Sequence, residues 1–227
     1  MTRLPPVKTS TRAVLTGDLV GSSDLTVESL HRARHALLDA LGEIGEWSPN
    51  LLGAEPEFFR GDSWQALLTH PMHVLRGVIY LRAKLRASDT QWDTRIAVGL
   101  GRVERIDKQR TSLSSGEAFN LSGRALDDLS SGLVAVAMPP ALSTYASGLV
   151  PLAQICSVMI DDWSQKQAQI ACLALPPSAP TQAEIADKLG VSQQSVSKTL
   201  AAAKLPSLMQ AITYCERLNW AKRIDMI

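Results

Sequence analysis

The chain has 227 residues, of which 45% are hydrophobic and 20% are charged, and its formal net charge is +1. This length holds one large domain or two small ones, and the hydrophobic content is ample for a packed core. No apolar run approaches the roughly 18 residues needed to span a bilayer, which excludes a membrane-spanning protein.

Strand and helix patterns alternate over the first 145 residues, in the order strand, helix, hairpin, helix, strand, helix, strand. The predicted elements cover residues 12–18, 26–46, 57–68, 72–87, 95–100, 116–130 and 133–138. This order predicts an α+β fold of the ferredoxin-like kind, with a mixed or antiparallel sheet and helices on one face.

After about residue 145 the strand signals stop and only helical patterns remain. Helices are predicted at residues 149–161, at 165–174, within 181–200 and after Pro206. The chain is therefore predicted to contain an α+β domain over residues 1–147 and an all-α domain over residues 148–227.

Residues 181–200 predict two short helices joined at a glycine. Thr181 and Glu184 form a capping box that starts the first helix, and Gly190 stands at the turn, where a left-handed backbone favours a small residue. Apolar side chains at helical spacing turn both helices toward a core; they are Ile185, Ala186, Leu189, Val196 and Leu200. The pattern is typical of a helix-turn-helix, and the alternative is a plain helical hairpin.

The side chains that face outward from the second helix are of the types that bind DNA. Ser192, Gln193, Gln194, Ser197 and Lys198 carry hydroxyl, amide and ammonium groups that bond to base edges and phosphates. From Ser164 onward the chain has seven Lys and Arg against four Asp and Glu, whereas the remainder is net negative. This positive excess suits phosphate contact, but it is small, so we expect a homodimer on double-stranded DNA.

The three cysteines and the start of the chain indicate a cytoplasmic protein. Cys156, Cys172 and Cys215 all fall in apolar helical stretches without the spacing of a metal site. Their odd number indicates reduced, buried thiols. The polar, proline-containing start is not a signal peptide.

Two aspartates stand at positions where a metal site is expected. Asp18 ends the first strand and Asp62 lies at the tip of the hairpin. If that strand pairs with the hairpin, both carboxylates meet at one edge of the sheet, where they would bind Mg²⁺ or Mn²⁺ together with phosphate oxygens. The turn after Asp18 opens a helix and offers backbone N–H groups to a triphosphate; it consists of Val20, Gly21, Ser22 and Ser23. The alternative is ordinary turn chemistry, in which aspartate is common.

These motifs resemble the catalytic domain of class III nucleotidyl cyclases over roughly residues 10–145. That family carries an aspartate motif after its first strand, present here as Asp18-Leu-Val-Gly-Ser-Ser-Asp-Leu25, and a Gly-Asp hairpin, present as Gly61-Asp62. It also carries a helix with Asn followed four residues later by Arg, present as Asn120-Leu-Ser-Gly-Arg124. The resemblance implies a palm-type sheet, Asp18 and Asp62 as metal ligands, and a nucleoside triphosphate as ligand.

The resemblance further implies a head-to-tail dimer in which Asn120 and Arg124 act as catalytic residues on the ribose and phosphates bound by the other subunit. By residue type alone, Asn120 is equally a helix-surface amide and Arg124 an ordinary exposed ion-pair residue. The chain departs from the family where the purine is selected, because Phe58 and the vicinity of Leu113 occupy those positions. Neither side chain can bond a purine edge, and a late lysine of the family has no clear equivalent.

A cyclase-like domain followed by a helix-turn-helix, of the kind found in the fourth region of sigma factors, resembles the layout of SatD-like bacterial proteins. Those proteins are described as regulators without a settled activity. The favoured hypothesis is a DNA-binding transcriptional regulator whose N-terminal domain dimerises and senses a nucleotide. The alternative is a metal-dependent nucleotidyl cyclase or nucleotidyl transferase that uses Asp18 and Asp62. A third hypothesis is a vestigial nucleotide site on a domain that only pairs subunits.

Overall fold

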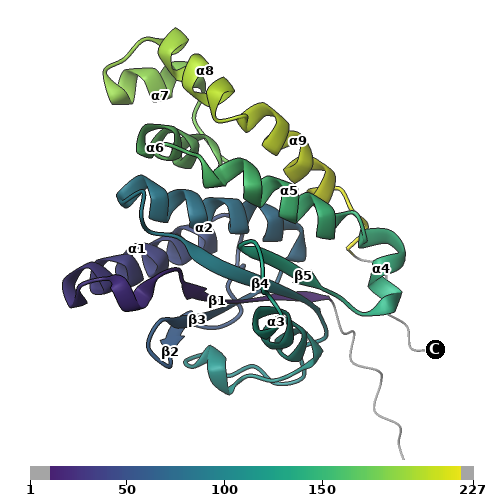
Figure 1. The fold of residues 1–227 in the computed structure, drawn as a ribbon. Coiled ribbons are helices and arrows are strands. Elements are labelled where there is room, and N and C mark those ends of the chain that lie inside the picture. The colour runs from purple at the N-terminus through teal and green to yellow at the C-terminus, as the bar shows by residue number, and fades with distance from the viewer. Residues whose placement is uncertain (1–10, 221–227) are drawn as a thin grey trace, which may run out of the picture.

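The computed structural model describes residues 11–220, which form a five-stranded sheet surrounded by helices (Figure 1). The strands are β1 (Arg12–Leu19), β2 (Glu57–Phe59), β3 (Ser63–Leu68), β4 (Thr94–Gly101) and β5 (Val134–Ala137). Their order in the sheet is β2–β3–β1–β4–β5, with β1 antiparallel to both neighbours and β5 parallel to β4. The sheet is therefore mixed, which agrees with the predicted α+β class.

Two long helices cover one face of the sheet. α1 (Val27–Gly45) begins after Thr26, whose hydroxyl accepts a hydrogen bond from the N–H of Ser29, and α2 (Val74–Ser88) leads into β4. Their apolar sides join the main hydrophobic core through residues such as Leu37 and Ile79. This arrangement of strand, helix, hairpin, helix and strand is the predicted ferredoxin-like order.

A third helix, α3 (Glu117–Asp127), lies on the opposite face, so the prediction that the helices share one face is wrong (Figure 1). The central strand is apolar on both sides, which allows a second, smaller hydrophobic cluster to form beneath the sheet. That cluster contains Val14, Leu67, Ala118 and Phe119. A Cβ atom on Gly99 would lie 2.0 Å from the carbonyl oxygen of Ala118, so glycine is what lets α3 approach β4.

In the described part of the chain, the residues after β5 are helical. The helices are α4 (Pro140–Ala146), α5 (Leu149–Asp161), α6 (Gln165–Ala174), α7 (Gln182–Leu189), α8 (Gln193–Ala202) and α9 (Leu205–Glu216). Single turns of 3-10 helix occur at Ser22–Asp24, Pro71–His73 and Thr111–Leu113. None of the helices within residues 11–220 has the length and apolar character that crossing a bilayer requires.

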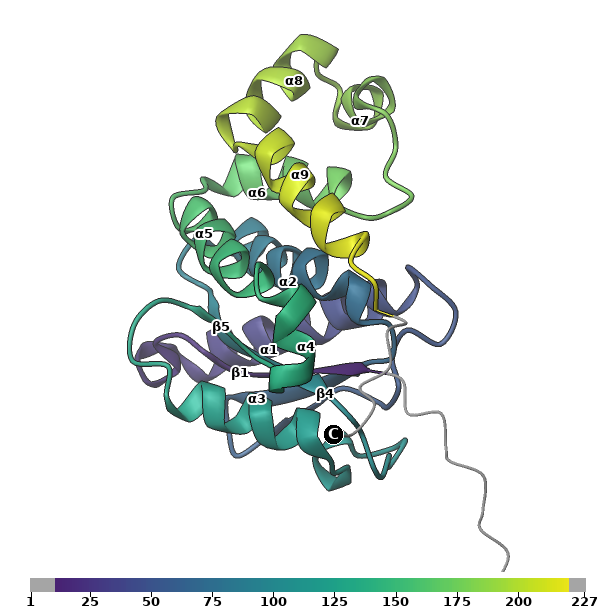
Figure 2. The same ribbon diagram turned by 90° about the vertical axis from the view of Figure 1, so that its right-hand side faces the viewer.

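The C-terminal helices stack on the α1/α2 side of the sheet (Figures 1 and 2). α6 and α5 pack against α2, and α5 also packs against β5. One cluster of buried side chains runs from Leu15 in the sheet through Cys156 in α5 to Val196 in α8 and Ile212 in α9. The division at residues 147/148 remains a prediction, and the hydrophobic core is continuous across it.

All three cysteines are free, and the prediction that all of them are buried holds for two. Cys156 and Cys215 are buried, whereas Cys172 is partly buried. Burial raises the pKa of Cys156 to about 11 and that of Cys215 to about 12, so both thiols are protonated at neutral pH.

Candidate functional site

The end of β1 brings Asp18 beside the β2–β3 hairpin. In the antiparallel ladders Asp18 lies opposite Ser63 of β3 on one side and opposite Arg95 of β4 on the other. Asp62 immediately precedes Ser63 in the hairpin turn, in which Gly61 has a left-handed φ of 83°. The two aspartates therefore lie at the same edge of the sheet, although their role as metal ligands stays a prediction.

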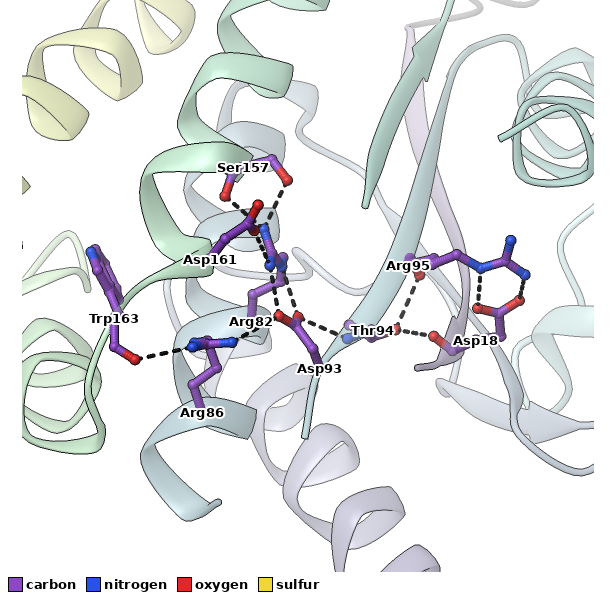
Figure 3. Close-up of polar contacts among 9 residues, drawn as sticks. All are labelled: Asp18, Arg82, Arg86, Asp93, Thr94, Arg95, Ser157, Asp161 and Trp163. Carbon is purple, nitrogen blue, oxygen red and sulfur yellow. Dashed lines mark hydrogen bonds and ion pairs between the residues drawn. The ribbon is translucent and has the colours of Figure 1, made fainter. Parts of the chain in front are cut away.

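The carboxylate of Asp18 is engaged by Arg95 (Figure 3). Nε of Arg95 donates to Oδ1 of Asp18 at 2.8 Å, and Nη2 donates to Oδ2. This paired hydrogen bond, to which the charge of nearby Asp62 adds, raises the pKa of Arg95 above its ordinary value. The Asp18 side chain is 15% exposed and that of Arg95 is 39% exposed, so the ion pair lies at the surface of the sheet edge.

The turn after β1 folds back over this edge. The hydroxyl of Ser22 donates to the carboxylate of Asp62, and the backbone N–H of Val20 donates to the carbonyl of Asp93 at 2.9 Å. Gly21 makes the turn possible with a left-handed φ of 61°. The long helix α1 does not start in this turn but after Thr26. Residues 20–23 therefore do not lie at the N-terminus of a long helix, where the helix dipole was expected to act. Phosphate binding by Val20 to Ser23 stays a prediction.

The donor set at this edge fits a divalent cation only in part. Two carboxylates at one sheet edge are the kind of ligand that Mg²⁺ uses together with substrate phosphates. Within residues 11–220, however, no three His, Cys, Asp or Glu side chains are grouped to hold a metal ion. Both oxygens of Asp18 already accept hydrogen bonds from Arg95. The edge is therefore a salt bridge that a cation would have to open.

Asn120 and Arg124 lie on the exposed side of α3. They line a groove of about 790 Å³ together with Arg102 and Glu104, and the residues around this groove do not include Asp18 or Asp62. The start of α3 is positioned by Glu117, whose Oε2 accepts a hydrogen bond from the N–H of Arg102 at 3.2 Å. Asn120 and Arg124 thus share one groove, and Asp18 and Asp62 are not among its lining residues.

The two predicted base-selecting positions carry apolar side chains. Phe58 is partly buried beneath the guanidinium of Arg34, whose carbon lies 4.7 Å from the ring centroid. Leu113 is 48% exposed at the end of a single 3-10 turn. Neither offers a hydrogen-bonding group to a purine edge.

The segment predicted as a helix-turn-helix forms two capped helices that pack on each other and on α6. Thr181 and Glu184 make both hydrogen bonds of the capping box at α7, and the hydroxyl of Ser192 accepts from the N–H of Ser195 to cap α8. Gly190 adopts the left-handed conformation at the turn, with a φ of 64°. These local predictions are confirmed, whereas DNA binding by the segment stays a prediction.

The α7–α8 pair projects at one end of the molecule (Figures 1 and 2). Val196 and Leu200 are buried, but Leu189, which was expected to face the core, is 42% exposed because it is the last residue of α7 before the turn. The predicted DNA-binding side chains all lie on the exposed side of the second helix; they are Ser192, Gln193, Gln194, Ser197 and Lys198.

A buried polar network joins the sheet to the C-terminal helices (Figure 3). The fully buried Arg82 of α2 donates to both carboxylate oxygens of Asp93, at 2.8 and 2.6 Å, and to Asp161 of α5 at 2.7 Å. Asp93 also accepts from the N–H of Thr94, whose hydroxyl donates to the carbonyl of Asp18 at 2.7 Å. The network thus ends at the backbone of the candidate site.

The same network reaches α8 through Arg86 and Trp163. Arg86 donates to the carbonyl of Trp163 at 3.1 Å, and the indole of Trp163 donates to the carbonyl of Ala203, the C-cap of α8, at 3.0 Å. Neither Arg82 nor Arg95 was predicted from the sequence to have a functional role. The sequence does indicate them, because each is a charged residue within an apolar helix or strand pattern, where an unpaired charge is not tolerated.

Similarity to known proteins is found among solved structures. No protein-family model matches the chain, and no curated protein matches it. Solved structures that resemble it include a bacterial light-regulated adenylyl cyclase, at 16% identity and a TM-score of 0.40, over 57% of this chain and 77% of that one. The guanylyl cyclase Cya2 matches at 18% identity and a TM-score of 0.39, over 57% of this chain and 77% of that one. The adenylyl cyclase CyaB from P. aeruginosa matches at 14% identity and a TM-score of 0.35, over 62% of this chain and 82% of that one.

Proposed function

We propose that this protein binds double-stranded DNA through α8 and acts as a transcriptional regulator. The observation that carries this proposal is the division of α8 into two sides. Val196 and Leu200 anchor the helix in the core, while its first turns present amide, hydroxyl and ammonium groups to solvent. Such a helix, held at a fixed angle by α7 and α6, suits insertion into a major groove.

The proposal includes a homodimer. A single α8 offers few phosphate contacts, because Lys198 is the only basic residue between Gln193 and Ala202. Two copies whose recognition helices lie about 34 Å apart would reach successive major grooves of one DNA duplex. A cytoplasmic location and membership of the SatD-like group are part of the same proposal.

The test is a fluorescence-anisotropy titration with DNA from upstream of the protein's own gene, run at several salt concentrations. The double variant Gln194→Ala/Lys198→Ala is expected to bind at least about tenfold more weakly, since a good base contact contributes about 1–3 kcal/mol. The slope of the logarithm of its binding constant against the logarithm of the salt concentration should also fall by about one, because one phosphate contact is lost.

The matched control is Lys108→Ala. This lysine is exposed in the loop between β4 and α3, a segment that lies far from α8 (Figure 1). The substitution removes one positive charge, as Lys198→Ala does. If Lys108→Ala weakens binding as much as the α8 variant, the DNA affinity is a general charge effect. Unchanged binding by the α8 variant would refute the proposal.

A second candidate function is favoured by the position of Asp18 and Asp62. Both lie at one sheet edge, and Ser22 ties the following turn to the same place. Asp18 and Asp62 would hold Mg²⁺ or Mn²⁺, which would neutralise the charge of a bound triphosphate. In a head-to-tail dimer, Asn120 and Arg124 of the other copy would complete a nucleotidyl cyclase or transferase site.

This second function is tested by incubating the protein with each of the four nucleoside triphosphates and Mn²⁺ or Mg²⁺. Pyrophosphate release that disappears in Asp18→Asn and in Asn120→Ala would establish the enzyme. Release that persists in Asp18→Asn would point to a contaminant. Absence of release, together with nucleotide-dependent thermal stabilisation, would leave a nucleotide sensor.

A further inference from the structure

We propose that the exposed side of α5 is the surface through which two copies of this chain pair, with their α5 helices antiparallel about a two-fold axis. This pairing rests on the proposed function, because it supplies the interface of the homodimer that we place on DNA. It does not involve the two aspartates at the sheet edge.

α5 turns an apolar stripe toward solvent. Pro151, Ile155 and Val158 follow one another at spacings of four and three residues, which places them on one side of the helix. Ile155 is 57% exposed, Val158 is 66% exposed and Pro151 is exposed as well. The segment from Leu149 to Ile160 contains no charged residue. An apolar spacing of four and three residues is that of a seam between two packed helices.

The opposite side of α5 is fixed in the core, so the stripe cannot turn inward. Ala153, Cys156 and Ile160 are buried. The hydroxyl and the carbonyl of Ser157 accept hydrogen bonds from the buried guanidinium of Arg82, at 2.8 and 2.9 Å. A helix held in this way presents its outer side without rearrangement, which favours association because little conformational freedom is lost.

The two ends of the stripe carry opposite charges. At one end, Asp162 is exposed one turn after Val158. At the other end α9 runs beside α5 (Figure 2), and the hydroxyl of Tyr214 lies close to Gly148, where a Cβ atom would be 3.2 Å from it. Arg217 is exposed one turn after Tyr214 and lines the same groove of about 460 Å³.

This arrangement is complementary to itself, which is why the occupant is a second copy of the chain. A two-fold axis beside Ile155 sets Pro151 of one copy against Val158 of the other, since both lie about one turn from the axis. The same axis brings Asp162 of one copy to the end at which the other copy carries Arg217. Both acid–base contacts form together at the rim of an apolar centre, which fixes the register of the pair.

The experiment is sedimentation-velocity ultracentrifugation of the full chain over a series of protein concentrations. The wild type is expected to sediment as a species of twice the 24.6 kDa mass of one chain. Ile155→Glu sets two carboxylates against each other at the axis and should weaken the dimer by at least about a hundredfold. Val27→Glu is the matched control, because Val27 is 87% exposed at the start of α1, and this variant should stay dimeric.

A charge-reversal set tests the antiparallel register. Asp162→Arg and Arg217→Asp should each weaken the dimer by about tenfold, because each places like charges at both ends of the interface. The double variant Asp162→Arg/Arg217→Asp restores opposite charges between the copies and should regain the wild-type dissociation constant. Losses in the single variants without recovery in the double variant would overturn the pairing.

Circular dichroism checks that each variant folds, and the exposed charge-reversal positions keep the test valid if Ile155→Glu does not. A monomeric wild type, a dimer that survives Ile155→Glu, or equal dissociation of Val27→Glu would each overturn the α5 interface. If the wild type still binds DNA through α8 in any of these cases, the proposed function stands without this interface. A dimer that Ile155→Glu dissociates, in a chain that binds no DNA, would support the interface and refute the proposed function.

Discussion

Arg82 shows how one residue can decide the packing between two parts of this chain. Its side chain is fully buried in α2 and makes ion pairs with Asp93 and Asp161, and its Nη1 also donates to the hydroxyl and carbonyl of Ser157. Burial lowers the pKa of Arg82, but the hydrogen bonds and charges of the two aspartates outweigh it and hold that pKa above its ordinary value. The guanidinium is therefore charged, with every nitrogen partnered.

We expect Arg82→Ala to destabilise the protein by about 3–5 kcal/mol, because it leaves Asp93 as a buried carboxylate without its main partner. The measurement is the midpoint of urea unfolding. Lys84→Ala, which breaks a partly exposed pair with Glu43, is the matched control and should cost less than about 1 kcal/mol. Equal losses for the two variants would show that Arg82 contributes no more than a surface ion pair.

At the scale of single residues, His73 makes the stability of the folded protein depend on pH. Its Nδ1 lies 3.9 Å from the carboxylate of Glu216 and, within residues 11–220, has no hydrogen-bond partner. Burial lowers the pKa of His73. Glu216 raises it, Arg76 and His70 lower it further, and the net shift is downward. His73 is therefore neutral in the folded protein near neutral pH.

Because the unfolded chain takes up the proton more readily than the folded protein, stability is full above about pH 6.5 and falls as the pH drops below that value. We expect the melting temperature of the wild type to decline more steeply between pH 7.5 and pH 5.5 than that of His73→Gln. Parallel declines in the two proteins would contradict this assignment.

At the scale of elements, the α7–α8 pair depends on the conformation of one glycine. Gly190 ends α7 with a φ of 64°, and its N–H donates to the carbonyls of Ala186 and Asp187. A Cβ atom there would meet nothing within 4 Å, so the requirement for glycine is conformational and not steric crowding. The angle between the two helices follows from this left-handed residue.

Gly190→Ala is expected to destabilise the protein by about 1 kcal/mol, the cost of placing an L-residue in the left-handed region. Gly42→Ala is the matched control, because Gly42 is exposed inside α1 and its added Cβ would also meet nothing within 4 Å. Because Gly42 has an ordinary helical backbone, Gly42→Ala should raise the free energy of unfolding by about 0.5–1 kcal/mol. Urea unfolding compares the two, and a shift of the same sign in both would refute the conformational argument.

At the scale of the whole molecule, one hydrophobic core serves both predicted domains. α5 and α6 pack on α2, and buried Trp163 ties the end of α8 to the same helix through Arg86. Residues on both sides of position 147 therefore lose their packing if the other side unfolds.

We expect residues 1–227 to unfold in a single cooperative transition. Differential scanning calorimetry should yield a calorimetric enthalpy equal to the van't Hoff enthalpy. Two resolved transitions would instead support separate domains that meet at the predicted boundary.

Much of the secondary structure could be predicted because its causes are local. The capping box at Thr181 needs only Glu184, three positions away, and it forms as expected. The glycine turn at Gly190 is equally local. The placement of α3 could not be predicted, since β1 is apolar on both faces and periodicity alone does not say which face receives which helix.

The candidate site, too, could be predicted from the sequence only in part. Asp18 and Asp62 could be located from their positions at the end of a strand and in a hairpin turn. The engagement of Asp18 by Arg95 joins residues 77 positions apart and depends on the register of β1 against β4. A shift of one residue would turn Arg95 to the other face, so no local pattern contains this contact.

By itself, the sequence determined most of the helices and strands, the capping box and glycine turn of the α7–α8 pair, and the polar side chains that α8 exposes, because short-range hydrogen bonding and periodic burial decide these features. The helix α4 was not predicted. Only the tertiary structure decided that α3 covers the second face, that Arg95 occupies Asp18, and that a buried chain of ion pairs and hydrogen bonds connects that edge to α8. Those features depend on contacts between distant residues, which strand register and the packing of whole helices select together.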